Sequence, residues 1–211
     1  MTAETTIENM NWRYAVKKYD SLKKLDADQL NLVKESLRLS PSSFGLEAWN
    51  FIHVTNPETR KQLRAAGYDQ PQITDASELF ILAPKVSIDA TYVETFISDV
   101  ATARTISIES LDGYKKSLMS AVARPAEALT NWLAHQVYIP LGVAIANLAQ
   151  NNIDASPMEG FDANAFDEIL GLKEHNLHAQ VILAVGFRAD DDTYSQMPKF
   201  REPTEIVFIE R

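Results

Sequence analysis

The most constraining feature of this sequence is a long, mostly apolar segment near the middle of the chain. Pro125 precedes the segment, and from Trp132 onward apolar residues occur on nearly every side of a helix drawn over residues 126–151. A helix that is apolar all round has to be buried. We therefore expect one long central helix over 126–151, kinked at Pro140, because proline lacks the backbone N–H and clashes with the preceding turn.

The central segment is not expected to cross a membrane. Its most continuous apolar run, Val137 to Ala149, has about 13 residues, whereas a bilayer needs ~20. Residues 1–11 are polar and contain two glutamates, with no basic stretch followed by an apolar one. We therefore expect no secretory signal and a cytoplasmic protein.

Helix and strand signals on both sides of this segment predict the fold class. Asp26, with Gln29 three residues later, predicts a capped helix over 26–40. Asn56 followed by Pro57 predicts the start of a helix over 58–66. Further helices are expected over 92–108, 114–123 and 162–170, and strands over 49–55, 79–88, 180–187 and 205–210. This order does not alternate as in a doubly wound sheet, and it indicates an α+β protein with a modest sheet flanked by helices.

Composition excludes several functional classes. The chain has 211 residues, which fits a single domain over 1–211. It has no cysteine, so disulfides, thiolate metal sites and cysteine nucleophiles are excluded. The formal net charge is −9, from 20 basic and 29 acidic residues. An acidic chain of this kind is not expected to bind nucleic acid, which requires basic groups to neutralise phosphates.

Two short segments at opposite ends of the chain concentrate positive charge. Residues 12–19 contain three cations, and Lys199 and Arg201 alternate in a stretch bounded by prolines. If that stretch is extended, the two side chains point the same way. Arginine offers a two-pronged donor that matches phosphate. Charge runs are also typical of an ordinary solvated surface, so the residues alone leave both interpretations open.

Two loops have the residue types that bind a polar or flat ligand. Residues 40–49 combine small hydroxyl side chains with Gly45, so backbone N–H groups and hydroxyls there can hold the edge of a ligand. Residues 156–161 contain Gly160, whose missing side chain allows close approach of the backbone to a flat molecule. Each loop could equally be a simple connection.

Taken in order, these segments resemble the nitroreductase family of flavin-dependent oxidoreductases, from about Glu8 to Glu210. The sequence Arg-Tyr-Ala-Val-Lys-Lys-Tyr at 13–19 is similar to the family's arginine-led FMN motif. Ser40–Ser43 is similar to the first flavin loop of the family, and Asp75–Ser77 to its middle segment. The central helix of the family is matched by Trp132, Gln136 and Tyr138, and the loop after that helix by Pro157–Asp162. Pro198–Arg201 is similar to the closing phosphate motif.

The resemblance implies a fold and an assembly. Family members have a central, mostly antiparallel sheet wrapped by helices, and they form homodimers with two FMN molecules at the subunit interface. Their C-terminal strand crosses to the partner's sheet, and residues 205–210 are expected to be that strand. An exposed edge strand of this kind would be a liability in a monomer.

The resemblance also implies which residues hold FMN. Arg13, Lys199 and Arg201 would grip the phosphate, and Lys17 would stabilise negative charge on the reduced ring. Residues 157–160 would cover one ring face, with a backbone N–H near N5, and residues 41–43 would act through the partner subunit. The implied FMN-binding set is Arg13, Tyr14, Ala15, Lys17, Pro41, Ser42, Ser43, Gln70, Gln72, Gln136, Pro157, Met158, Glu159, Gly160, Lys199 and Arg201.

The implied activity is electron transfer from NAD(P)H, the co-substrate, to nitroaromatic compounds, quinones or related acceptors. Hydride would pass to flavin N5 and then to an acceptor bound in the same place, a ping-pong cycle that needs no side-chain base. The expected electron acceptor is a small molecule. The alternatives are a module that sequesters or senses FMN without rapid turnover, and a flavin-free α+β domain.

Acceptor preference is the least defined part of this expectation. The loop from Phe44 to Trp49 is less polar than in the best-known bacterial nitroreductases, and Gln72 stands where they often carry a lysine. Helices within 92–123 would cover the pocket. The expected substrate contacts are Phe44, Tyr114, Leu118 and Met119, although the last three could equally belong to the core of these helices.

The remaining polar residues are expected to be structural. His175 and His178 are three residues apart but have no partner carboxylate at a recognised spacing, so no metal site is expected. His53, within an expected strand, is interpreted as structural. The aspartates at 190–192 are interpreted as a solvated loop, because a calcium loop needs a glycine and further ligands at fixed spacing.

Overall fold

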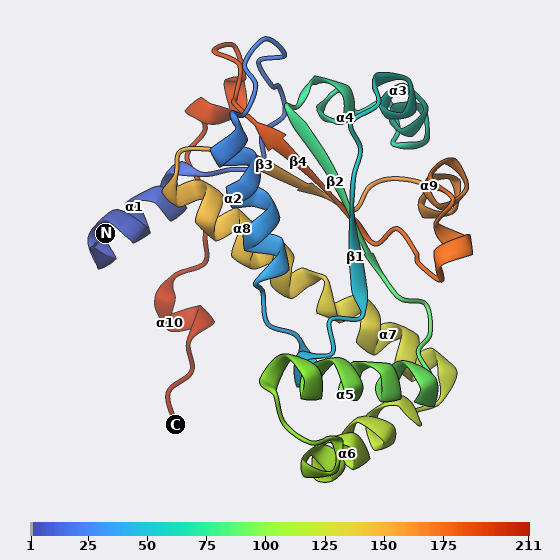
Figure 1. Cartoon of the computed structure of the whole chain (residues 1–211). Helices are drawn as coiled ribbons and strands as arrows, with labels where there is room; N and C mark the ends of the chain where they lie inside the picture. Colours follow the sequence, from blue (N-terminus) through green and yellow to red (C-terminus); the bar gives the residue numbers. More distant parts are fainter. Residues whose placement is uncertain (1) are drawn as a thin grey trace.

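The computed structural model describes residues 2–211 and has a four-stranded antiparallel sheet at its centre (Figure 1). The strands lie in the order β1-β2-β4-β3, so β1 and β3 form the two edges. Their bounds are β1 Trp49–His53, β2 Glu78–Pro84, β3 Asp154–Met158 and β4 Val181–Gly186. The helices are α1 Ala3–Trp12, α2 Ala27–Arg38, α3 Pro57–Ala66, α4 Gln72–Asp75, α5 Ala90–Arg104, α6 Asp112–Val122, α7 Ala126–Gln136, α8 Tyr138–Gln150, α9 Ala163–Leu170 and α10 Thr204–Val207. The α+β class is therefore confirmed.

The expected long central helix is present as two consecutive helices. α7 ends at Gln136 and α8 begins at Tyr138, with Val137 between them. Pro140 is the third residue of α8, where its missing N–H would have had no intrahelical acceptor. The interruption thus lies one turn before the proline that was expected to disturb the helix.

By length and composition, the helical stretch over residues 126–150 is apolar enough to cross a membrane. Their packing accounts for that composition. Leu141 and Leu148 of α8 are buried against the sheet, and Leu133 of α7 is buried against α5 and α6.

Both faces of the sheet are covered by helices, and the two central strands are apolar and buried along their length except at Glu78, the first residue of β2. In β2, Leu79 and Ile81 face one cluster while Phe80 and Leu82 face the other, as the two-residue period of a strand requires. Helices α2 and α8 cover the second face, and α3, α4 and α9 cover the first (Figure 1).

Helices α5, α6 and part of α7 form a separate lobe at the lower end of Figure 1. Its core contains Val93 and Ile97 of α5, Leu118 of α6 and Leu133 of α7. Leu46 and Ala48, in the segment after α2, join the same core. The lobe is therefore fixed to the segment that leads into β1.

Several helix starts follow the predicted local chemistry. Asp26 and Gln29 form a reciprocal capping box at α2. The Asn56 side chain accepts from the backbone N–H groups of Glu58 and Thr59 at the start of α3. Asp162 caps α9 in the same way through Ala165.

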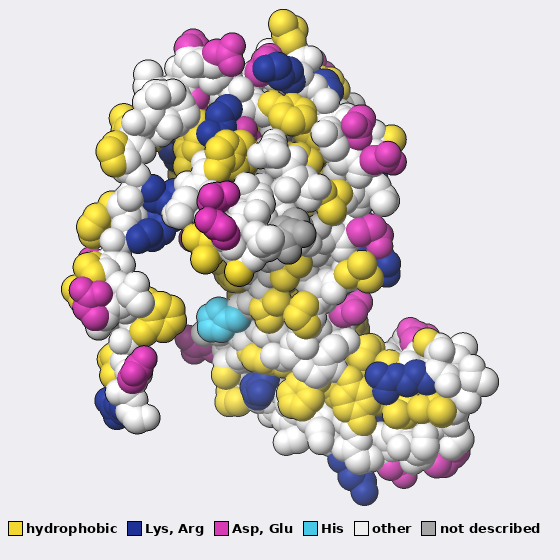
Figure 2. All heavy atoms as spheres, turned by 90° about the vertical axis from the view of Figure 1, so that its left-hand side faces the viewer, with side chains coloured by type: hydrophobic (Ala, Val, Ile, Leu, Met, Phe, Trp, Pro, Cys, Tyr) yellow, Lys and Arg dark blue, Asp and Glu magenta, His cyan; other side chains and the backbone are white. Residues whose placement is uncertain are grey.

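Two expectations about strands were wrong. Residues 154–158, expected to lead into a loop, form edge strand β3, where Pro157 is tolerated because an edge strand leaves half of its N–H groups unpaired. Residues 205–210, expected to be a strand, contain the short helix α10, and within residues 2–211 no strand follows β4. Among residues 2–211 no strand pairs with this segment, and Figure 2 shows it separated from the rest of the molecule. Helix α1 was not expected, because the N-terminal residues lack an apolar stripe; none of its side chains is buried.

Candidate functional site

The two basic segments from opposite ends of the chain meet in one cleft. The cleft has a volume of about 570 Å³ and is lined by residues 11–15, Lys17, 194–195 and 197–201. Its basic side chains are Arg13, Lys17, Lys199 and Arg201. No acidic residue lines it within the part of the chain that the structure describes. Four cations in one hollow give this part of a protein with net charge −9 a locally positive charge, which attracts anions.

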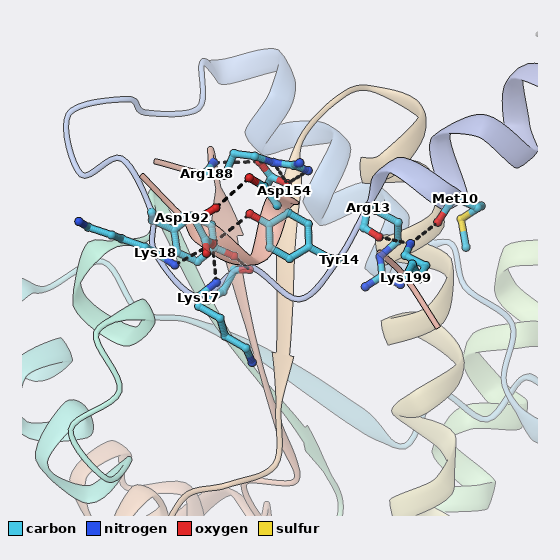
Figure 3. A network of polar contacts seen from close by, with 12 residues as sticks. Met10, Arg13, Tyr14, Lys17, Lys18, Asp154, Arg188, Asp192 and Lys199 are labelled. Atoms are coloured by element: carbon cyan, nitrogen blue, oxygen red, sulfur yellow. Dashed lines mark hydrogen bonds and ion pairs between the residues drawn. The ribbon is translucent and has the colours of Figure 1, made fainter. Parts of the chain in front are cut away.

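Lys199 ties the C-terminal segment to the end of α1. Its Nζ donates to the carbonyl of Met10 at 2.9 Å and also to the carbonyl of Arg13 (Figure 3). Burial lowers the pKa of Lys199, and the neighbouring charges of Arg13 and Arg201 lower it further. Burial, followed by the charge of Arg201, likewise lowers the pKa of Arg13. These cations therefore repel one another and gain if an anion binds between them.

Asp192 holds the basic N-terminal segment in place. Its Oδ2 accepts from the Tyr14 hydroxyl at 3.0 Å and from the backbone N–H groups of Lys17 at 2.9 Å and Lys18 at 3.1 Å (Figure 3). Its Oδ1 accepts from the backbone N–H of Tyr194 at 3.1 Å. Asp192 is only 3% exposed, so the interpretation of residues 190–192 as a wholly solvated loop was wrong for this residue.

A buried ion pair supports the aromatic side chains beside the cleft. The Arg188 guanidinium donates to both carboxylate oxygens of Asp154, at 2.6 to 3.0 Å. The same guanidinium lies 4.1 Å from the ring centre of Trp12 and 4.5 Å from that of Tyr14. The contacts fix the path of residues 12–14.

A second group of the predicted residues lies at the far end of β3. The Gln70 amide donates to the carbonyl of Gly160 at 2.7 Å. Glu159 accepts a hydrogen bond from the Tyr138 hydroxyl, which in turn accepts from Gln180 at 3.1 Å. Met158 is buried in the core and Pro157 is half-buried on β3, so these two line the group from beneath.

The basic cleft and this second group are joined by β3. Ala15 of the basic segment pairs with Ala155 near the start of the strand, and Glu159 follows its last residue. Four residues of strand between them span about 13 Å. An elongated ligand with an anionic end and a flat polar end could therefore lie along this edge.

A third group lies in the loop after α2. The backbone N–H of Ser43 donates to Gln136 Oε1 at 2.8 Å, and Ser42 Oγ accepts from the N–H of Glu47 at 2.9 Å. The Tyr114 hydroxyl donates to the carbonyl of Phe44. Pro41 begins this loop and is exposed.

In one chain the third group does not join the basic cleft. Gln136 lies just before the start of α8. At the other end of this helix, its last residue, Gln150, accepts a hydrogen bond from Asn9 of α1. The 13 residues of α8 separate the two places, a distance of about 20 Å at 1.5 Å per residue. Figure 1 shows the same arrangement, with α1 beside one end of α8 and the loop after α2 beside α5.

Of the alternatives left open for the helices over the pocket, the structure favours core packing at two positions. Leu118 is fully buried in the core of the lobe, so here it packs rather than lining a pocket. Met119 is partly buried against the same core. Gln72 is 5% exposed, and its Oε1 has no hydrogen-bond partner within the described residues. Ser156 Oγ is also buried and likewise has no hydrogen-bond partner within the described residues.

Sequence reasoning missed Asp192, Arg188 and Asp154. Each acts through contacts between segments more than 30 residues apart in the chain. The only local signal was a charged residue next to an apolar strand, as with Arg188 after β4. His53 is structural as expected, because it pairs with Glu78 at 2.6 Å and stacks on Phe80.

Comparison with known proteins gives a consistent result. The model of the nitroreductase family matches residues 10–187. An oxygen-insensitive NAD(P)H nitroreductase of Salmonella typhimurium is 30% identical over 207 residues, covering 94% of this chain and 95% of that protein. One from Enterobacter cloacae is 29% identical, with the same coverage.

Solved structures agree in fold. A nitroreductase-like protein of Streptococcus mutans has a TM-score of 0.83 at 18% identity, over 100% of this chain and 99% of its own. A protein of Exiguobacterium sibiricum, assigned as a nitroreductase and solved in complex with FMN, has a TM-score of 0.81 at 18% identity and the same coverage.

Proposed function

The chain belongs to the nitroreductase family, and from this we propose that it is an FMN-dependent oxidoreductase that takes electrons from NAD(P)H. The observation that carries the proposal is the cleft in which Arg13, Lys17, Lys199 and Arg201 converge from the two ends of the chain. An acidic protein needs such a cluster to hold a phosphate group.

The residues in place fit FMN. The cationic cleft suits the phosphate, and the polar groups of Gln70 and Gly160 lie about 13 Å away along β3, where a flat ring would find hydrogen-bonding partners. The unpartnered Oε1 of Gln72 and Oγ of Ser156 are further polar atoms that the chain itself leaves unsatisfied. We assign the phosphate to Arg13, Lys199 and Arg201, and the ring edge to Lys17, Gln70 and residues 157–160.

Bound FMN supplies the acceptance and release of a hydride, and the chain supplies orientation and charge. Lys17 is exposed and lies two residues after Ala15, which pairs with β3, so its cation would stabilise negative charge on a ring bound along that strand. The hydrogen bond from Tyr138 to Glu159 fixes the loop that carries Gly160. No proton transfer by a side chain is required of these residues.

We propose that the working unit is a homodimer. Pro41, Ser42, Ser43 and Gln136 lie about 20 Å from the basic cleft of their own chain, so they serve a ring only if a second copy brings them to it. The C-terminal segment supports the same arrangement, because Phe208 is 68% exposed and Ile209 is 77% exposed. Apolar side chains of this kind gain by packing on a partner, and we assign residues 205–210 to exchange between subunits.

We further propose that NAD(P)H and the electron acceptor bind in turn at one place, in a ping-pong cycle, and that the enzyme works in the cytoplasm. Nitroaromatic compounds and quinones are the acceptor classes. The sequence has no glycine-rich dinucleotide fingerprint, so we expect no separate site for NAD(P)H. The nucleotide and the acceptor would then use the same place in turn.

Steady-state turnover tests this proposal. The protein loaded with FMN is mixed with NADH or NADPH and a neutral nitroaromatic acceptor, and nucleotide oxidation is followed at varied acceptor concentration. We expect parallel double-reciprocal plots and loss of turnover when FMN is removed. A protein that retains FMN but does not oxidise either nucleotide is a flavin-binding module, and the proposal would then be wrong.

A further inference from the structure

Phe44 and Trp132 form an aromatic platform on the lobe side of the third group. Their rings meet edge to face with centres 6.4 Å apart. Phe44 is 44% exposed although it is a large apolar residue, and Trp132 is half-buried beneath it. Gln136, one turn after Trp132 on α7, binds the backbone of Ser43, so the platform lies directly beside the residues we assign to the ring.

The loop holds Phe44 in an uncommon conformation. Its φ is 57°, in the left-handed region that non-glycine residues avoid, and Glu47 nearby has a φ of 48°. The Tyr114 hydroxyl and Gln136 fix the loop from α6 and α7. Strain of this kind persists only where neighbouring contacts over-determine it, and it is concentrated at ligand-binding positions. The backbone at Phe44 is therefore held in place by its neighbours.

Arg124 lies against this platform and is not neutralised by the chain. Its guanidinium carbon is 4.4 Å from the ring centre of Trp132. Within residues 2–211 no carboxylate lies within 4.0 Å of it, and its buried Nη1 has no hydrogen-bond partner. A guanidinium has five N–H donors, and leaving one of them buried without an acceptor is unfavourable.

We infer that Arg124, with the aromatic platform of Phe44 and Trp132, selects electron acceptors that carry a carboxylate or another small anionic group on a planar ring. The inference rests on the proposed function, because it concerns the acceptor of that reaction. The platform supplies the stacking surface, and the half-buried guanidinium supplies an unneutralised charge and those of its N–H donors that are not buried. Arg104 adds positive charge near Tyr114 on the same lobe.

Two acceptors of the same shape and different charge test this inference. The wild-type protein loaded with FMN is compared with Arg124→Gln, using 4-nitrobenzoate and the neutral 4-nitrobenzamide. We expect the ratio of kcat/KM for the anion to that for the amide to fall about tenfold in Arg124→Gln, with the value for the amide changed less than about twofold. Arg124→Lys keeps the charge and should retain about a third of the wild-type ratio.

Equilibrium dialysis of 4-nitrobenzoate against the oxidised protein gives a readout that does not depend on turnover. Its dissociation constant should rise about tenfold in Arg124→Gln. Lys116→Gln, which removes one charge from an exposed residue of α6, is the matched control and should leave both measurements unchanged.

The outcomes separate this inference from its alternatives. If the anion and the amide lose activity equally, Arg124 only supports packing and the inference is wrong. It is also wrong if Lys116→Gln has the same effect, or if only the preference for NADPH over NADH falls, because Arg124 would then hold the nucleotide phosphate. A wild-type protein that turns over neither acceptor contradicts the proposed function, whereas the dialysis still decides whether Arg124 binds the anion.

Discussion

Replacing Asp192 by alanine should strongly destabilise the protein and disorganise the basic cleft. The carboxylate accepts from Tyr14, Lys17 and Lys18 through one oxygen and from Tyr194 through the other, and it is 3% exposed. It therefore joins the N-terminal basic segment to the segment that leads to the C-terminal cations through four hydrogen bonds.

The size of the effect follows from the number of donors left without an acceptor. Asp192→Ala removes the partner of four donors, and a buried donor left unsatisfied costs ~1–3 kcal/mol. Because Lys17 and Lys18 are themselves exposed, water reaches part of the gap. The low end for four donors is about 4 kcal/mol, and with part of the gap hydrated we expect a loss of about 3 kcal/mol in the free energy of unfolding, a large part of a typical total of ~5–15 kcal/mol.

Urea unfolding of the two proteins at pH 7, followed by circular dichroism, measures this loss. With an m-value of about 2–3 kcal/mol/M, the midpoint should fall by roughly 1–1.5 M. The control is Asp191→Ala, next in the chain, whose carboxylate is 68% exposed and pairs with Lys18 at the surface. That change should cost less than about 1 kcal/mol.

The loss should also depend on pH with a defined sign. Burial alone would raise the pKa of Asp192, but the donors from Lys17, Lys18, Tyr14 and Tyr194 outweigh it, so the pKa is below its ordinary value of 3.8. A lowered pKa stabilises the folded state above the ordinary value, and this contribution is lost as the pH falls through the folded-state pKa. The gap between wild type and Asp192→Ala should be equal at pH 7 and pH 5 and smaller below pH 3.8. A midpoint shift no larger than that of Asp191→Ala, or a gap that widens in acid, would refute this reasoning.

Three further changes test other parts of the structure. Arg201→Ala should weaken FMN binding at least tenfold, because it removes a contact worth ~1.5–3 kcal/mol. The control is Lys61→Ala, at an exposed lysine of α3. An FMN dissociation constant that dialysis finds unchanged in Arg201→Ala would place the phosphate elsewhere. Arg188→Ala should lower stability by about 3 kcal/mol in urea, because Asp154 stays buried without its partner, and Arg188→Lys should recover only part of this. Removal of residues 197–211 should convert a dimer to a monomer in sedimentation analysis, and a truncated protein that remains dimeric would count against subunit exchange.

The sequence predicted the elements whose signals are local. The capping residues Asp26 and Asn56 place α2 and α3 correctly, and Pro140 explains the break before α8. By contrast, Ser156-Pro157 has a loop-like composition, and it forms β3 only because β4 offers a complementary edge. Whether residues 205–210 pair as a strand depends on a neighbour that a single chain does not contain.

The candidate site shows the same division. The residue types left open whether the cations at the two ends of the chain form a surface or a site, and only the family resemblance grouped them; in the structure they lie in one cleft. Asp192 escaped detection because its donors are backbone N–H groups of residues about 175 positions away. Arg124 was missed because the sequence pattern indicates that Trp132, which its guanidinium contacts in space, belongs to a buried helix.

The absorption spectrum of the protein loaded with FMN, recorded without oxygen before and after addition of NADH or NADPH, tests the central claim most directly. We predict that the bands of oxidised flavin disappear with at least one nucleotide and return when a nitroaromatic acceptor is added. A protein that does not take up FMN, or one whose flavin bands persist with both nucleotides, would contradict the account.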